Sequence, residues 1–234
     1  LLAVQGAWNY ERMLGTGMGY AAEPLLADLT ESDPVRHTEA VVRSAEFFNC
    51  NPMLAGLALG ATVRAEYDAA PGAQVARLRT ALCSPLGALG DQFFWAGLLP
   101  MLVAAALIGV VLGAGFWAVV GLLIAYGAVR LWTGAWALRT GLASGLRVGQ
   151  AINASWLPNG VRRVGPVAGF AVGLAVPLAA GWYLRDFSQH AAAAVIALAV
   201  AIVVAVRWLQ PAVTSVRFTL AAVGLTILLR WVVA

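Results

Sequence analysis

Amide and carboxylate side chains flank apolar segments at two places in this sequence. Asn49, Asn51 and Glu66 surround the uncharged stretch NPMLAGLALGATV (residues 51–63), and Asp91 immediately precedes a long apolar run. Such side chains hydrogen-bond either the hydroxyl groups of a ligand or the backbone of the protein itself. Asp91 stands out because only one further carboxylate, Asp186, follows it in 143 residues.

Two interpretations of these polar residues remain open. A carboxylate that starts a helix after Gly90 accepts bonds from free backbone N–H groups and opposes the helix dipole. Alternatively, Asp91 faces a ligand path or a partner subunit, since ionisable residues at membrane depth are functional candidates. Residues 49–52 (NCNP) are likewise either a turn or the rim of such a path.

A third polar group lies near the start of the chain, in QGAWNYERM (residues 5–13). It consists of Gln5, Trp8, Asn9, Glu11 and Arg12. Glu11 and Arg12 are adjacent, so on a helix they point about 100° apart and each needs another partner. Subunit contact, packing under residues 51–63, and ligand contact all remain open. Glu46 lies within reach of Arg43, three residues earlier.

The sequence predicts no catalytic, metal or cofactor site. Two cysteines and two histidines lie far apart, with no C-x-x-C. The glycines of GTGMG (residues 15–19) match no phosphate-binding loop, and we expect them to allow close helix packing. The first residues have neither a basic region nor a small-residue cleavage site, so no signal peptide is expected.

The composition predicts an integral membrane protein. Hydrophobic residues make up 61% of the chain and charged residues 11%, and residues 92–129 carry no charge. About 20 apolar residues cross a bilayer, so this run of 38 holds one long span or two close ones. Residues 1–91 carry a net charge of −4 and residues 92–234 a net of +8. The arginines therefore set topology and meet lipid phosphate, and nucleic-acid binding explains them poorly.

The predicted fold is all-α, with amphipathic or re-entrant helices in residues 1–91 and a transmembrane bundle in residues 92–234. Asp33 and Pro34 predict a helix start, with Val41, Val42, Ala45 and Phe48 on one face. Residues 51–63 are too few to span a membrane, which favours a re-entrant hairpin or a buried helix.

About five spans are expected in the second region. Their ranges are roughly 94–112, 116–131, 164–184, 191–208 and 212–233. The third is expected to break or kink at Pro166 and Pro177. Five arginines within residues 130–163 predict a cytoplasmic connection, in part helical, with the N-terminus inside and the C-terminus outside.

Three stretches resemble the mannose/fructose/sorbose-type IID subunits of the phosphotransferase system. QGAWNYERM is similar to the family motif Q-G-[SA]-W-N-[FY]-E-R-M, and AEFFNCNP (residues 45–52) to L-E-F-F-N-T-x-P. SPLGALGDQFFWAGLLP (residues 84–100) resembles G-P-L-A-G-[VI]-G-D-x-[IL]-F-W-G-T-x-x-P. Weaker similarity extends over nearly the whole chain, which is identified as a divergent, shortened member.

The resemblance implies a non-catalytic subunit of the bacterial inner membrane, with no phosphorylated histidine. It would pair with a IIC subunit and form oligomers of such pairs, trimers in the family pattern, to translocate a hexose. Cytoplasmic IIA and IIB subunits would relay phosphate, and IIB would phosphorylate the sugar. The ten polar and aromatic residues named above would then line the sugar pathway or contact IIC.

Several positions depart from the family pattern. Ser44 replaces a frequent His, Gln92 a Pro, Leu99 an Arg and Gly127 an Asn, and the region between the third and fourth spans is shorter. These losses motivate an alternative, a diverged IID that acts in assembly or regulation without transport. A stand-alone membrane enzyme or channel is a further alternative, which no group of convergent His, Cys, Ser or paired carboxylates supports.

Overall fold

The computed structural model describes residues 3–185, 187–189, 193, 196, 197 and 200. Regular secondary structure in these residues is helical, beside isolated bridges at Asn9–Met13 and Met13–Phe48, as the all-α prediction requires. The chain forms two compact units, Leu1–Val176 and Pro177–Ala234, and the packing below is internal to the first. The expected fourth and fifth spans fall almost wholly outside the described residues.

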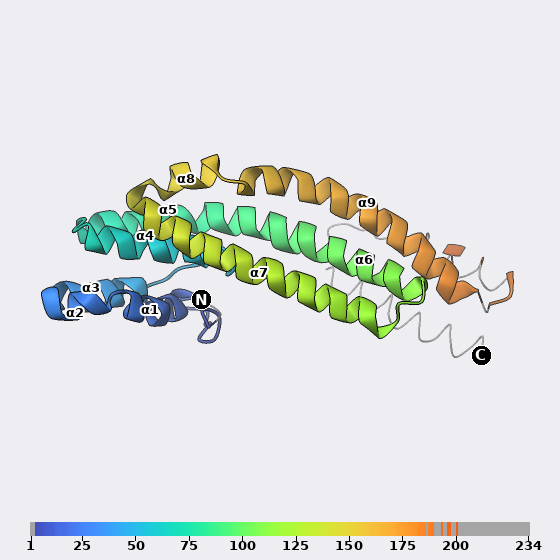
Figure 1. The fold of residues 1–234 in the computed structure, drawn as a ribbon, viewed down its shortest axis with the longest axis horizontal. Helices are drawn as coiled ribbons and strands as arrows, with labels where there is room; N and C mark the ends of the chain where they lie inside the picture. The colour runs from blue at the N-terminus through green and yellow to red at the C-terminus, as the bar shows by residue number, and fades with distance from the viewer. Residues whose placement is uncertain (1–2, 186, 190–192, 194–195, 198–199, 201–234) are drawn as a thin grey trace. The chain divides into compact units, whose positions relative to one another are not determined.

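The N-terminal region folds into short helices that pack on one another. They are α1 (Gly15–Ala22), the 3-10 helix η1 (Glu23–Leu25), α2 (Ala27–Ser32) and α3 (Pro34–Ser44), drawn in blue in Figure 1. The predicted start of α3 is confirmed, because Asp33 Oδ1 accepts the Arg36 N–H at 3.0 Å and Pro34 is the first helical residue. Its predicted apolar face is partly wrong. Phe48 is buried and Val41 and Ala45 are partly buried, but Val42 is 62% exposed.

The glycines of GTGMG allow close backbone contact, as expected. A Cβ atom on Gly15 would lie 2.0 Å from the Glu46 carbonyl oxygen, and one on Gly17 would lie 2.0 Å from that of Val4. Side chains at these positions would push α1 away from residues 45–46 and from the segment around Val4.

Helix α4 (Ala55–Tyr67) lies at the centre of the first unit. All its residues except Arg64 and Tyr67 are buried. One continuous helix over this range makes the re-entrant hairpin wrong and supports the alternative of a buried helix. Helix α4 packs closely on α7 (Phe116–Ser144). A Cβ on Gly60 would lie 2.5 Å from the Leu138 carbonyl oxygen, and one on Gly141 would lie 2.5 Å from that of Leu57.

The first expected span belongs to a longer helix. Helix α5 (Gly72–Gly90), the π-helix η2 (Asp91–Leu98) and α6 (Leu99–Val111) follow one another without a break from Gly72 to Val111. The predicted division of the chain between residues 91 and 92 therefore falls inside this helix. Gly113 and Gly115, with φ of +94° and +52°, form the turn into α7, and α6 and α7 lie side by side (Figure 1).

The arginine-bearing stretch is more helical than expected. Helix α7 continues to Ser144, beyond the predicted end near residue 131, and the 3-10 helix η3 (Gly145–Arg147) and α8 (Val148–Ala154) follow. Helix α9 (Leu157–Leu184) starts before the predicted third span and runs through Pro166 and Pro177 without interruption. Two stretches of the described chain, Gly72–Val111 and Phe116–Leu184, are long and apolar enough to cross a membrane.

The close approach of α4 and α7 leads to a stability prediction. Replacing Gly60 with Ala forces the α7 backbone to move, which costs about 1–3 kcal/mol for overpacking. We expect the thermal midpoint of the detergent-solubilised protein to fall by several degrees. Gly127→Ala is the matched control, because a Cβ there meets nothing within 4 Å and the midpoint should hold or rise. Equal midpoints for the two variants would contradict this packing.

Candidate functional site

The first polar group lies on an exposed turn. Asn9 organises it, since Asn9 Oδ1 accepts the N–H groups of Glu11 at 3.1 Å and Arg12 at 2.8 Å. Trp8 packs edge to face on Tyr10, with ring centroids 4.9 Å apart. The side chains of Gln5, Trp8, Asn9, Glu11 and Arg12 are all exposed. Among the described residues, neither Glu11 nor Arg12 forms an ion pair.

Backbone hydrogen bonds join this turn to the segment AEFFNCNP. The Leu14 N–H donates to the Phe48 carbonyl at 2.9 Å, and the Phe48 N–H donates to the Arg12 carbonyl at 3.2 Å. Met13, between them, adopts φ +52°, which is unusual for a residue with a side chain. Two segments more than thirty residues apart in sequence are thus held together at their backbones.

A side-chain hydrogen bond joins AEFFNCNP to the third stretch. Asn51 Nδ2 donates to Asp91 Oδ1 at 3.0 Å, and Asn51 Oδ1 accepts the Met53 N–H at 3.1 Å. Asn51 is 1% exposed, so its amide is fixed in place. Gly90 permits the approach, because a Cβ there would lie 2.2 Å from the Asn51 Cβ.

Asp91 does not cap a helix, so that interpretation is wrong. Helix α5 already runs into it, and its N–H donates to the carbonyls of the preceding turn, Gly87 and Ala88. Its carboxylate instead opens the π-helix and accepts from Asn51. π-Helical turns are rare and are frequent at functional sites.

The three stretches together line an open polar pocket of about 550 Å³. We call it the motif pocket. Its lining consists of Gln5, Asn49, Cys50, Pro52, Cys83, Ser84, Gly87, Ala88, Asp91 and Trp95. Amide, carboxylate, hydroxyl and thiol groups therefore converge from the N-terminal turn, the 49–52 turn and one face of the α5–η2 helix. This arrangement can hydrogen-bond a hydroxyl-bearing ligand or the polar groups of a partner protein.

Cys83, Ser84 and Trp95 line this pocket although the sequence interpretation did not select them. Residues 84, 88, 91 and 95 are three or four apart, which puts them on one helical face. That spacing is informative only if a single helix runs through Asp91, whereas the sequence interpretation started a new helix there.

Glu66 lies in a separate, buried ion-pair cluster. Its Oε1 lies 2.9 Å from Arg43 Nε, its Oε2 lies 3.0 Å from Arg36 Nη2, and its side chain is 3% exposed. Arg43 therefore pairs with Glu66 and not with Glu46, as the sequence spacing had suggested. Glu46 is exposed, and its carbonyl accepts from Arg79 Nη2 at 3.1 Å.

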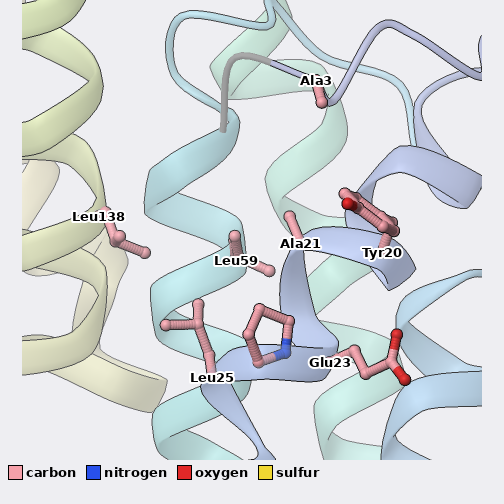
Figure 2. A pocket seen from close by; sticks show the side chains of 8 residues that line it. Ala3, Tyr20, Ala21, Glu23, Leu25, Leu59 and Leu138 are labelled. Atoms are coloured by element: carbon pink, nitrogen blue, oxygen red, sulfur yellow. The ribbon is translucent and has the colours of Figure 1, made fainter.

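A second, more apolar pocket of about 510 Å³ lies beside α1 and η1. Figure 2 shows Leu25, Leu59 and Leu138 converging on it from η1, α4 and α7, with Tyr20 and Glu23 nearby. Its lining residues belong to none of the three polar groups, so it is distinct from the motif pocket.

The Glu66 cluster gives a prediction about folding. Glu66→Gln leaves two arginines in a mostly buried position without their counter-charge, a change that costs about 3–5 kcal/mol for buried pairs. We expect a large loss of folded protein in detergent, measured by thermal unfolding and gel filtration. Asp68→Asn is the control, because it removes the exposed Arg64–Asp68 pair and should leave the midpoint unchanged. A stable Glu66→Gln variant would show that the cluster is dispensable.

Comparison with known proteins now identifies the family. The sequence matches the PTS system mannose/fructose/sorbose family IID component over residues 1–233. It is 32% identical over 105 residues to the mannose-specific EIID component of Escherichia coli K12, covering 43% of this chain and 37% of that protein. It is 27% identical over 148 residues to the fructose permease IID component of Bacillus subtilis 168, covering 61% and 53%. The matched regions thus span about a third to a half of these relatives.

Two solved structures share the fold. One is described as a cryoEM structure of the mannose transporter ManYZ in complex with microcin E492, with a TM-score of 0.56 and 24% identity. The other is described as a membrane protein, with a TM-score of 0.63 and 25% identity. Each likeness covers 73% of this chain and 64% of the other. The chain belongs to the IID family of the mannose/fructose/sorbose phosphotransferase system, whose members are membrane subunits of a sugar-transport complex.

Proposed function

We propose that this chain pairs with a IIC subunit to translocate a hexose, which a IIB subunit phosphorylates. The observation that carries the proposal is the convergence of the three family motifs on the motif pocket. The chain itself would be non-catalytic, with phosphate relayed through IIA and IIB. Residues 1–91 and 92–234 would work together as one IID unit.

The motif pocket would contribute to the sugar pathway or to the surface that shapes it. Gln5, Asn49 and Asp91 line it, and Asn51 holds the Asp91 carboxylate in place. The side chains of Trp8, Glu11, Arg12 and Glu46 are exposed, and Trp8 and Arg12 are of the residue types that most often anchor protein interfaces. We assign them to contact with IIC, with Asn9 shaping their turn. Glu66 would act indirectly, by holding α3 against α4.

The subunit would reside in the bacterial inner membrane as a multi-pass protein with a cytoplasmic N-terminus. Two long apolar helical stretches support the membrane location. The five arginines of residues 130–163, which extend from α7 through η3 into the start of α9, support a cytoplasmic position for this part of the chain. Oligomers of IIC–IID pairs are part of the proposal. The similar ManYZ structure, a mannose transporter by its description, supports the assignment to transport.

A diverged subunit without transport activity is the second candidate. Ser44, which stands where the family motif often has His, is 5% exposed. A buried hydroxyl at this position cannot supply the imidazole that the motif provides. This departure favours a role in assembly or regulation of a transport complex.

Deletion of this chain separates the two candidates. If it takes part in transport, a strain that lacks only this subunit should lose hexose uptake and phosphorylation. Uptake should return with the wild-type chain supplied in trans. Unimpaired uptake after deletion would reject the transport role and support the regulatory one.

Asp91→Asn tests the pocket itself. The variant removes the charge that Asn51 contacts, and charged hydrogen bonds contribute about 1.5–3 kcal/mol, so we expect uptake to fall about tenfold or more. Co-purification with IIC is measured on the same samples. Asp28→Asn, the same change on exposed α2, is the control and should retain both uptake and assembly. Normal uptake and assembly in Asp91→Asn would exclude a role for its charge.

A further inference from the structure

The motif pocket contains two thiols, and they are the only cysteines of the chain. Cys50 lies on the 49–52 turn and Cys83 on α5, and both are free. Cys50 is 8% exposed, and its Sγ donates to the Asn51 carbonyl at 3.2 Å. Cys83 is partly exposed, and its Sγ lies 3.5 Å from the Arg79 carbonyl. Cys50 stands where the family motif has Thr, so the pair is a feature of this sequence.

The segment around Cys50 follows α5 closely. The Glu46 carbonyl accepts from Arg79, and the Arg79 guanidinium lies 5.2 Å from the centre of the Phe48 ring. A Cβ on Gly87 would lie 4.0 Å from the Cys50 Cα, and Asn51 bonds to Asp91. The segment of residues 46–51 thus contacts this helix both before Cys83, at Arg79, and after it, at Gly87 and Asp91.

This register brings the two cysteines close to each other. Cys83 lies one helical turn, about 6 Å, from both Arg79 and Gly87, on the side that residues 46–51 cover. Disulfide-bonded cysteines have Cα atoms about 4.4–6.8 Å apart. Both cysteines line the motif pocket, and Cys83 is near enough to act electrostatically on Cys50.

We propose that Cys50 and Cys83 are an oxidation site that reacts with small disulfides such as oxidised glutathione to form a disulfide across the motif pocket. The Cys83 thiolate attacks the small disulfide, forms a mixed disulfide and releases one thiolate. Cys50 then loses its proton and attacks the Cys83 sulfur, releasing the second thiolate. Two protein thiols are oxidised, and one small disulfide is reduced to two thiols.

The surroundings of the two thiols fix the order of these steps. Cys83 is more exposed and meets the small disulfide first. Burial raises the pKa of the Cys50 thiol, and Cys83 and Asp91 add smaller contributions in the same direction. Cys50 is therefore protonated at neutral pH, and closure of the bridge should accelerate as the pH rises from 7 to 9.

The bridge would fix the 49–52 turn to α5, beside the Asn51–Asp91 hydrogen bond. Resting on the proposed function, this closes the motif pocket and lowers hexose uptake under oxidising conditions. In a reducing cytoplasm the thiols remain free and the pocket stays open.

The test uses the purified full chain in detergent, treated with oxidised glutathione. Free thiols are counted by alkylation, and linked peptides are identified by mass spectrometry. We expect both thiols to disappear and a Cys50–Cys83 peptide pair to form. Cys50→Ser should stop at a glutathione adduct on Cys83, and Cys83→Ser should react at least tenfold more slowly. A stable adduct on wild-type Cys83 with Cys50 still free, bridges only between chains, or no reaction would each overturn the proposal.

A cellular measurement tests the regulatory consequence separately. Cells with the wild-type chain should lose most hexose uptake on oxidation with diamide and recover it with dithiothreitol. Cys50→Thr, which restores the residue of the family motif, should be insensitive when compared with its own untreated uptake. Bridge formation without a change in uptake overturns the regulatory claim. If hexose uptake does not require this subunit, the proposed function is rejected. The Cys50–Cys83 bridge seen in the purified chain would still stand.

Discussion

The contact between α4 and α7 is made at the level of the backbone. Gly60 and Gly141 put peptide groups of the two helices where side chains would otherwise separate them. Because α4 is buried on nearly all sides, α1, α3, α5 and α7 each take their position from it. Dispersion attraction strengthens as two surfaces approach. By letting α4 and α7 come close, the two glycines therefore strengthen the attraction between the atoms of both helices around the crossing.

This central helix explains how three distant motifs meet. AEFFNCNP leads directly into α4, and its backbone accepts the N-terminal turn on one side through Phe48. Its Asn51 contacts Asp91 on the other side. Motif residues that shape the backbone, such as Gly90, are therefore as important to the motif pocket as the residues that carry its charge.

The sequence predicted features that depend on local rules. Asp33 and Pro34 start α3 because a cap and a fixed φ act within a few residues, and the GTGMG glycines pack as expected. The same local rules gave a wrong prediction at Asp91, because Gly-Asp at the edge of an apolar run resembles a helix start. The helix continues through Asp91, since its N–H donates to the carbonyls of Gly87 and Ala88 and its carboxylate bonds to the distant Asn51.

Ion pairs between residues that are far apart in the sequence could not be predicted either. Glu66 finds Arg36 and Arg43 across more than twenty residues, while sequence spacing pointed from Arg43 to Glu46. Hydropathy likewise underestimated the lengths of the helices, since α7 remains helical well beyond its most apolar part. Apolar composition marks the part of a helix that can enter lipid, and the helix itself ends where its hydrogen bonding ends.

The π-helix between α5 and α6 has a mechanical consequence. It closes hydrogen bonds from i to i+5, so each of its turns takes in more chain than an α-helical turn. The stripe of side chains that faces the motif pocket is thereby rotated relative to the stripe that α6 presents to α7. Within this one 40-residue helix, Asp91 can therefore face the motif pocket while the apolar α6 packs on α7.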